Sequence, residues 1–561
     1  MLPELQLLTL TIYSPMLPSQ LLERVRQHIQ RGEETETIAL LASYMEENPF
    51  HGDLWHILGR YSEEAQEYEQ AIAAYQKAIE CGNRWSGATE YHLASTLMRQ
   101  GRGEEAVSWL EKTLRISFRL LPELEGDNLW EPLRSNERFA SLFAPRLSST
   151  LDRITGWRAD LAYMARRMEQ GHYDLFGRET PLSREVWQAA IADLDQRIPT
   201  LEDHEIVVEL MRIVALAGDG HTNLFPFGVE QGYLAEQKGL FDYAPVMFYL
   251  FEDGLFVRGA KQEYKETVGA RVLRIGSVTA EEALERIKPL VFNDNIMQIK
   301  RQGPLLLSCP AIAHALGISE SRGYLDVQLQ QEMKEPFNVR LHKDADIPPW
   351  FVWLSVEPEN WVSMCDGALP RPLWLKQSEL YWFEYLEDQQ IVYCQYNGVQ
   401  NMKEESLAAF SERLFAFIED YEVRALVLDL RRNGGGDLTT YRPLLHGIIQ
   451  NRKVNRRGSL FALIGRHTFS AAQHFINQLD THTEVTFVGE CSGSRPQFVG
   501  EGNPFSLPYS GLEVNVSNRF WQGTFALDGR LWIAPHIRAE FTSHDYRANR
   551  DPALEAILAE L

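Results

Sequence analysis

Cysteine is scarce in this sequence, and positive charge is outnumbered. The 561 residues include five scattered cysteines that form no Cys-x-x-Cys pair, so we expect neither a disulfide framework nor a zinc site. Lys and Arg number 55 against 78 Asp and Glu, and the net charge of −23 repels nucleic-acid phosphates and anionic lipids. No apolar run approaches the about 18 residues of a membrane span. We therefore expect no metal, no nucleic-acid partner and no membrane partner.

The N-terminal residues lack the basic segment of a secretory signal. An apolar patch at residues 5–12 has no Lys or Arg before it and no clear small-residue cleavage site after it. We therefore expect a cytoplasmic protein. A start at Met16 is an alternative, and a wrongly placed start would hide an export signal.

The overall composition is that of a soluble globular protein with several domains. Hydrophobic residues make up 44% of the sequence and charged residues 24%, so extensive disorder is not expected. At about 100–200 residues per domain, the length predicts three or four domains. We expect a multidomain α+β protein.

The first domain, residues 17–148, is predicted to consist of helical repeats. A pattern of large and small residues repeats with a constant offset of 35. Leu58, Gly59, Ala71 and Tyr75 in the first copy correspond to Leu93, Ala94, Ala106 and Leu110 in the second. This pattern of large and small residues resembles tetratricopeptide repeats, in which paired helices close on each other over small side chains. The repeats would either bind a protein partner or serve as a spacer.

Two further domains are predicted before the C-terminal half. Residues 149–224 form a helical block that ends in Gly218-Asp219-Gly220-His221-Thr222. Residues 225–345 are dominated by short strands, expected at 244–251, 255–257 and 272–275, with a helix at 280–287. This module resembles a PDZ domain, which captures peptide ends by adding a strand to its sheet, although a purely structural β insert is the alternative.

The last domain, residues 346–561, is predicted to be built around a parallel sheet. A strand at 391–396, a helix at 404–421 and a strand at 425–430 form a β-α-β unit, for which a right-handed crossover is the rule. Further strands are expected at 460–464, 513–516 and 532–533.

Two strands of this domain end in segments that favour chemistry. After residues 425–430 comes Arg431-Arg432-Asn433-Gly434-Gly435-Gly436-Asp437, and glycine lets backbone N–H groups turn toward an anion. Ser470 lies between the strand at 460–464 and a helix, where the helix dipole and free N–H groups stabilise negative charge. The simpler interpretations are a glycine turn and a helix N-cap.

Five ordered motifs resemble the tail-specific, or C-terminal processing, serine peptidases. They are Gly218-Asp219-Gly220-His221-Thr222, Asp429-Leu430-Arg431-Arg432-Asn433-Gly434-Gly435-Gly436, Thr468-Phe469-Ser470-Ala471, Gly489-Glu490 with Gly493-Ser494-Arg495-Pro496, and Leu507-Pro508-Tyr509-Ser510-Gly511. The resemblance implies that residues 346–561 form the ββα spiral shared by ClpP-like and crotonase-like proteins, and that the substrate is a polypeptide.

The resemblance also implies roles for individual residues. Many of these peptidases use a Ser-Lys dyad, but the position of the lysine is occupied here by Arg495, and arginine cannot act as a base. The sequence is therefore more similar to the branch of the tricorn core and the interphotoreceptor retinoid-binding protein, which uses a histidine. This implies Ser470 as nucleophile and His221 as general base.

The remaining site residues also follow from the resemblance. The backbone N–H groups of Gly434 and Ala471 are expected to form the oxyanion hole, with Gly435 as the alternative to Gly434. Asp528 is the candidate for the third catalytic residue, whereas Asp219 is better explained as a brace of its own turn. No cofactor is implied.

The sequence therefore favours a serine peptidase that acts on extended or unfolded polypeptides through an acyl-enzyme. Two alternatives stay open, namely a catalytically weak or inactive protein of the same fold that holds a peptide or apolar ligand, and a crotonase-type acyl-CoA enzyme. A peptidase requires His221 and Ser470 to lie within hydrogen-bonding distance. The sequence does not indicate an oligomeric state.

Overall fold

The computed structural model describes most of the protein, which folds as two compact units. The described residues are Val25, Gln27, His28, Arg31, Leu124 and the ranges 33–116, 126–143, 151–177, 182–353, 355–367, 370–376 and 379–561. Unit 1 comprises Met1–Pro145 and unit 2 comprises Arg146–Leu561. The apolar patch at 5–12 and the alternative start at Met16 lie outside the described residues.

Unit 1 is helical, as predicted, and its two central hairpins carry the repeated residues. The helices are α3 (Glu34–Glu47), α4 (Gly52–Glu64), α5 (Tyr68–Cys81), α6 (Ala88–Arg99), α7 (Gly103–Ile116) and the short α9 (Glu137–Ala140). All eight repeated positions are buried, although Gly59 lacks a side chain. A β-carbon at Gly59 would lie 2.6 Å from the Tyr75 ring, so the close approach of α4 and α5 depends on glycine.

Unit 2 begins with the predicted helical block. Its helices are α10 (Arg153–Gly171), α11 (Arg184–Arg197) and α12 (Asp203–Ala215). Asp152 and Ser183 cap α10 and α11 by accepting hydrogen bonds from the amides of Thr155 and Val186. The backbone then turns through residues 218–222, here called the His turn, into β1 (Asn223–Leu224). β1 pairs antiparallel with β16 (Glu513–Asn515), a strand from the far end of the sequence.

The third part of the protein contains the predicted short strands, which form an antiparallel sheet. The strands follow the order β2 (Val246–Phe251), β3 (Gly254–Ala260), β4 (Arg271–Ile275), β6 (Tyr324–Gln330) and β7 (Phe337–His342). β5 (Val278–Thr279) pairs with β4, and the predicted helix is α13 (Ala280–Ile287). β8 (Val362–Ser363) pairs with β3, so this sheet extends past the predicted boundary at residue 345.

Two helices of this part were not predicted. They are α14 (Ile296–Leu306) and α15 (Pro310–Ala315). α14 contains Gly303 and Pro304, two residues that disfavour helix interiors, and it buries the polar side chains of Gln298 and Gln302. Polar residues thus interrupt the buried face that Met297, Leu305 and Leu306 begin and end, and this weakens the pattern by which a helix is recognised.

The C-terminal part contains a six-stranded sheet that is parallel except at one edge. The order is β18 (Ile537–Arg538), β13 (Thr486–Gly489), β12 (Leu460–Ile464), β11 (Ala425–Asp429), β10 (Ile391–Tyr396) and β9 (Tyr381–Leu386). Only β9 runs antiparallel to its neighbour. The predicted strands at 391–396, 425–430 and 460–464 are confirmed, as is the helix between the first two, α16 (Leu407–Asp420).

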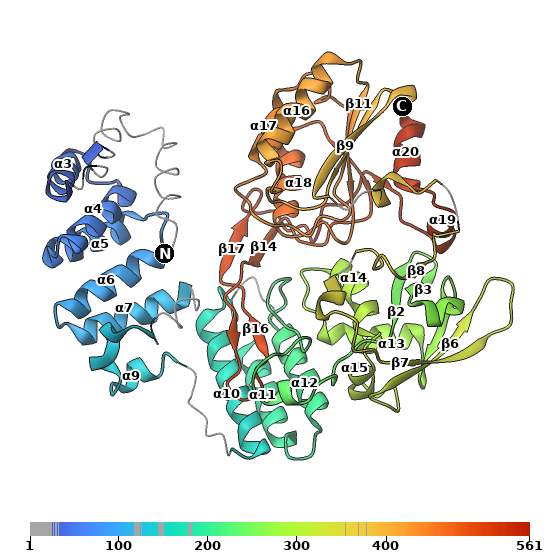
Figure 1. Cartoon of the computed structure of the whole chain (residues 1–561), viewed down its shortest axis with the longest axis horizontal. Coiled ribbons are helices and arrows are strands. Elements are labelled where there is room, and N and C mark those ends of the chain that lie inside the picture. The colour runs from blue at the N-terminus through green and yellow to red at the C-terminus, as the bar shows by residue number, and fades with distance from the viewer. Residues whose placement is uncertain are drawn as a thin grey trace. The chain divides into compact units, whose positions relative to one another are not determined.

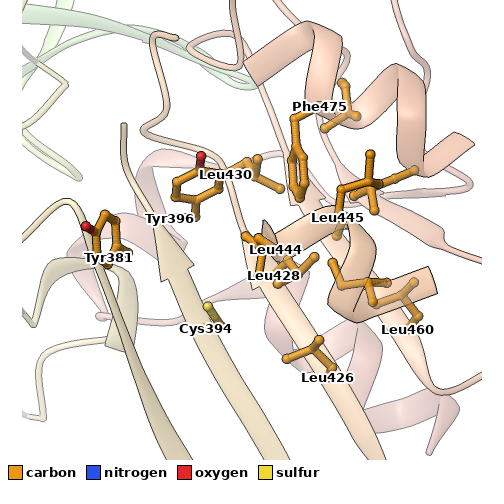
Figure 2. Packing of buried hydrophobic residues seen from close by; sticks show 14 of the residues in the cluster. Tyr381, Cys394, Tyr396, Leu426, Leu428, Leu430, Leu444, Leu445, Leu460 and Phe475 are labelled. Carbon is orange, nitrogen blue, oxygen red and sulfur yellow. The ribbon is translucent and has the colours of Figure 1, made fainter. Parts of the chain in front are cut away.

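Helices cover both faces of this sheet, which explains its continuous apolar strands. α16, α17 (Arg442–Gln450) and α18 (Ala471–His482) pack on one face, and α20 (Pro552–Glu560) packs on the other. Figure 2 shows Leu426 and Leu428 of β11 facing Leu444 of α17 and Phe475 of α18. A strand that is buried on both sides carries no polar alternation.

The prediction of a late strand at 532–533 is wrong. The backbone of Ile533 forms hydrogen bonds with Ser492 and not with a neighbouring strand. Its N–H donates to the Ser492 hydroxyl at 2.9 Å, and its C=O accepts from the Ser492 N–H at 3.1 Å. The late strand of the sheet is β18, which begins after Pro535, a residue that lacks the N–H donor of a ladder. The strand predicted at 513–516 is confirmed as β16.

No helix among the described residues is both long enough and apolar enough to span a lipid bilayer.

Candidate active site

The candidate site lies where β11 and β12 end at their carboxyl termini. Neighbouring parallel strands bring the loops that follow them to the same edge of the sheet, which is the usual ligand-binding edge of such sheets. Residues 433–436, here called the glycine loop, follow β11, and residues 465–470, here called the serine loop, follow β12. The Phe469 N–H donates to the C=O of Asn433 at 3.1 Å and ties the two loops together.

The glycine loop has a backbone path that side chains would obstruct. Gly435 and Gly436 have φ angles of +106° and +142°, a region that L-residues rarely adopt. A β-carbon at Gly436 would lie 2.2 Å from the carbonyl oxygen of Val399, with which this segment forms a parallel bridge. The Asn433 side chain anchors the loop by donating to the C=O of Tyr396 at 2.8 Å. The loop is thus a fixed structure and not a flexible turn.

Ser470 stands on a strained turn at the start of α18. Its φ and ψ angles are +54° and −121°, a conformation that costs a non-glycine residue about 1–3 kcal/mol. Its side chain makes no capping hydrogen bond to α18, so the N-cap interpretation does not account for this serine. A β-carbon at Gly435 would lie 2.7 Å from the Ser470 β-carbon, so the glycine loop leaves room for Ser470.

The decisive contact of the site joins Ser470 to His221. The His221 Nε2 atom lies 3.0 Å from the Ser470 Oγ atom, although the two residues are 249 positions apart in the sequence. This is hydrogen-bonding distance between a base and the hydroxyl that it would deprotonate. The structure therefore brings together the two residues that the sequence assigned to nucleophile and base.

Two phenylalanine rings hold the His221 imidazole. The ring centroid of Phe469 lies 4.6 Å from that of His221, and the centroid of Phe498 on β14 (Gln497–Gly500) lies 5.3 Å away with nearly parallel planes. Burial lowers the pKa of His221 to about 4, an effect that the Asp219 carboxylate opposes. The imidazole is therefore neutral at pH 7 and able to accept a proton. Neither ring was singled out from the sequence.

Asp219 braces the His turn, as its sequence context predicted. Its Oδ1 atom accepts hydrogen bonds from the N–H groups of His221 and Thr222 at 2.8 and 2.7 Å and from the Ser517 hydroxyl at 2.6 Å. Its Oδ2 atom lies 2.9 Å from His172 Nε2. Burial alone would raise the pKa of Asp219, but the hydrogen bonds, led by that from His172, lower it to about 2. Asp219 thus orients His221 through the backbone.

Asp528, the predicted third catalytic residue, is engaged elsewhere. Its carboxylate accepts hydrogen bonds from Arg530 Nη2 and from the Thr524 hydroxyl, each at 2.8 Å. The His221 Nδ1 atom is buried and has no hydrogen-bond partner among the described residues. The structure therefore does not bring Asp528 to His221, because the arginine two positions later captures the carboxylate.

A buried carboxyl group that sequence reasoning missed lies beside the His turn. Asp294 Oδ1 accepts a hydrogen bond from the Gly220 N–H at 2.9 Å, just ahead of α14. Burial and the charge of Asp219 raise the pKa of Asp294 to about 7. Arg495, which occupies the position of the family lysine, donates from Nε to the backbone carbonyl of Asp294 at 2.8 Å. No motif marked Asp294, because its partner lies 74 residues earlier in the sequence.

The backbone N–H groups near Ser470 differ in their availability. The Gly435 N–H donates to the Asn433 side chain at 3.0 Å, which commits it to the glycine loop. The N–H groups of Gly434 and of Ala471, the first residue of α18, have no acceptor among the described residues. The first amides of a helix have no intrahelical acceptor, so the Ala471 N–H is free for a ligand. Of the three N–H groups predicted for the oxyanion hole, those of Gly434 and Ala471 are therefore the two that are available to a ligand.

Among the described residues, no group of three or more His, Cys, Asp or Glu side chains has an arrangement that would hold a metal ion.

No family model matches the sequence, and no curated protein matches it. Several solved structures are similar in fold. Mature CPAF has 13% sequence identity and a TM-score of 0.48, over 72% of the present sequence and 96% of its own. The photosystem II D1 C-terminal processing protease has 12% identity and a TM-score of 0.33, over 74% of the present sequence and 97% of its own. A protein described as a protease from Bacteroides fragilis has 13% identity and a TM-score of 0.25, over 58% and 86%. These values are too low to assign the protein to a family.

Proposed function

We propose that this protein is a serine peptidase of the tail-specific type, which cleaves extended or unfolded polypeptides through an acyl-enzyme. The 3.0 Å contact between His221 Nε2 and Ser470 Oγ at a strained turn carries this proposal. Strain of this kind persists where the surrounding structure enforces it, and it is concentrated at active sites. A protein that only holds a ligand would need neither the strain nor the contact, so we favour the enzyme over the binding protein.

The proposed reaction begins when His221 Nε2 accepts the proton of Ser470 as Oγ attacks the peptide carbonyl carbon. The resulting oxyanion receives hydrogen bonds from the N–H groups of Gly434 and Ala471, at the positive end of the α18 dipole. The tetrahedral intermediate then breaks its C–N bond, and the amine leaves with the proton from His221. Water attacks the acyl-enzyme in the same way and releases the second product and Ser470.

We propose a Ser-His dyad in place of a complete triad. Asp219 fixes the backbone of the His turn, and Phe469 and Phe498 fix the imidazole plane, so the base is oriented without a carboxylate on Nδ1. Asp528 is not part of this proposal, because Arg530 and Thr524 bind its carboxylate.

The other parts of the protein suggest how substrates are delivered. We propose that the hairpins of residues 17–148 are tetratricopeptide-like and contact a protein partner. We propose that residues 225–345 act as a PDZ-like module for a peptide end, and that residues 346–561 form the ClpP-like core. The paired helices of unit 1 and the antiparallel sheet β2-β3-β4-β6-β7 support these assignments. We propose a cytoplasmic location.

A serine-reactive fluorophosphonate tests the proposed function directly. The purified protein should be labelled at Ser470, because the reagent requires an activated hydroxyl and a nearby oxyanion hole. The Ser470→Ala variant should show no labelling above background in gel fluorescence. An unlabelled wild-type protein with a normal thermal unfolding curve would contradict the proposal.

The labelling rate should also have an unusual pH dependence. Only neutral His221 accepts a proton, and burial places its pKa near 4 instead of the usual value of about 6.5. The second-order labelling rate should therefore rise with pH through about 4 and be constant from about pH 5.5 to 8. The rate is measured by quenching labelling reactions at successive times in buffers of matched ionic strength. If the midpoint of the pH profile lies at or above pH 6.5, the His221 imidazole is more solvated than the structure indicates.

A further inference from the structure

Arg301 carries a buried charge for which the described residues provide no counter-ion. The side chain lies on α14, where only 9% of its surface is exposed, and its Nε atom has no hydrogen-bond partner among those residues. Burial alone lowers the pKa of Arg301 to about 10, with no opposing carboxylate. The guanidinium group nevertheless stays charged at neutral pH, and no carboxylate among the described residues offsets the energetic cost of its burial.

The other buried arginines of this region are all paired. Arg258 Nε lies 2.8 Å from Glu357, Arg431 Nη2 lies 2.8 Å from Asp551, and Arg466 Nη2 lies 2.7 Å from Glu490. Each of these three guanidinium groups therefore has a carboxylate partner within the fold. Arg301 differs from these three arginines because no carboxylate among the described residues pairs with it, so its charge is able to pair with a carboxylate from outside the protein.

α14 packs against the loops that carry Ser470. Gln298 Nε2 donates to the C=O of Gly493 at 3.0 Å, and the Gly493 N–H donates to the C=O of Thr468 at 2.9 Å. Arg466 Nη1 donates to the C=O of Lys300 at 3.3 Å. Burial first, and then the charge of Arg301, hold the pKa of His467 well below its usual value. The helix that carries Arg301 thus contacts the serine loop, and the charge of Arg301 acts on His467, three positions before Ser470.

Aromatic residues connect Arg301 to the other side of the site. The guanidinium carbon lies 5.6 Å from the centre of the Trp353 ring, and 42% of the Trp353 side chain is exposed. The Trp353 ring makes an edge-to-face contact with Phe225, four residues after His221, at 4.9 Å. Phe292 also lies 6.0 Å from the Trp353 ring. Arg301 therefore lies under a partly exposed aromatic surface that extends from the strand after the His turn.

We propose that Arg301 binds a carboxylate group of the polypeptide substrate and thereby selects which segments reach Ser470. The ligand is either the C-terminal carboxylate or an acidic side chain, because guanidinium groups bind both by paired hydrogen bonds. Trp353 and Phe225 would contact the neighbouring apolar part of the substrate. This inference rests on the proposed peptidase function and adds its substrate preference.

A binding experiment in the Ser470→Ala background tests the inference without turnover. Randomised octapeptides are prepared in matched sets with a free or an amidated C-terminus, and with Glu or Gln at one internal position. Peptides with the recognised carboxylate should bind about 10- to 100-fold more tightly than their amide counterparts, as expected for a charged hydrogen bond. If free and amidated C-termini differ in affinity, the recognised carboxylate is the C-terminus. If Glu and Gln peptides differ, it is the side chain. Equal binding of all sets, or no binding of any, would overturn the inference.

Variants of Arg301 separate recognition from structure. In the Ser470→Ala background, Arg301→Gln should bind all peptide sets equally, with the affinity that the protein with Arg301 has for peptides without the recognised carboxylate. Arg301→Lys should keep part of the preference for that carboxylate. Arg301→Met should leave Tm unchanged or raise it, because an apolar side chain replaces an uncompensated charge. The matched control Arg258→Met should lower Tm, since it leaves the buried Glu357 carboxylate unpaired. A clear fall in Tm for Arg301→Met would assign Arg301 a structural role and overturn the inference.

Fluorophosphonate labelling of the Arg301 variants keeps the two proposals distinguishable. If the wild-type protein is labelled at Ser470 but the Ser470→Ala protein binds peptides with and without the carboxylate equally, only the inference about Arg301 is contradicted. Absence of labelling in the wild-type protein would contradict the peptidase proposal itself.

Discussion

Replacing His221 with alanine is expected to lower the hydrolysis of unfolded, fluorescein-labelled β-casein by about 10⁴-fold or more in kcat/KM. The variant keeps Ser470 on its strained turn and keeps the free amides of Gly434 and Ala471, but it has no group that accepts the hydroxyl proton. The loss should appear in kcat, because the proton transfer belongs to the chemical step and not to substrate binding.

Asp528→Asn is the matched control for that experiment. If the site is a dyad, this change should leave kcat/KM within about twofold, because the Asp528 carboxylate bonds with Arg530 and Thr524 and not with His221. A large loss in Asp528→Asn, with unchanged thermal stability, would show that the loop rearranges to form a triad during turnover. An active His221→Ala variant would contradict the proposed mechanism altogether.

The Gly435→Ala change is expected to lower kcat/KM by about 10²-fold or more, although it adds one methyl group and removes no catalytic atom. The new β-carbon would lie 2.7 Å from that of Ser470 and 2.9 Å from the Ala471 nitrogen, at a backbone φ of +106°. Either Ser470 or the glycine loop must move, and displacements of about 1 Å cost about 10²-fold or more in rate. The same casein assay and fluorophosphonate labelling would measure the effect.

Gly529→Ala controls for the substitution of glycine itself. No atom lies within 4 Å of the position that its β-carbon would occupy, and its φ angle is not in the left-handed region. This variant should retain wild-type activity and labelling. Wild-type labelling of Gly435→Ala would show that the glycine loop is more adaptable than its contacts imply.

Local sequence patterns predicted the strands and helices whose residues repeat at a regular spacing along the sequence. The apolar runs at 391–396, 425–430 and 460–464 became buried strands because helices cover both faces of the sheet. The constant offset of 35 predicted two equivalent hairpins, since the same small residues are needed wherever two helices meet closely. The meeting of His221 with Ser470 was predicted from motifs, because no local pattern reports a contact across 249 residues.

The features that escaped prediction depend on partners distant in the sequence. The ring of Phe498 holds His221 only because β14 pairs with β17 (Arg519–Gln522) and lies beside the His turn. Asp528 fits the expected position of a third catalytic residue, but the side chain of Arg530 decides where its carboxylate bonds. α14 buries polar as well as apolar side chains, and this mixed face made neither the helix nor the buried charge of Arg301 recognisable from hydrophobic periodicity.

The pairing of β1 with β16 has a consequence for the protein during its own synthesis. Asn223, two residues after His221, is in register with Asn515, and the Asn515 side chain donates to the C=O of His221 at 2.9 Å. During synthesis on the ribosome, His221 is therefore translated long before β16, the strand whose Asn515 side chain holds the His221 backbone in place. If the protein is the peptidase proposed above, its site would be complete only after β16 has been translated, and the emerging polypeptide would be protected from cleavage until then.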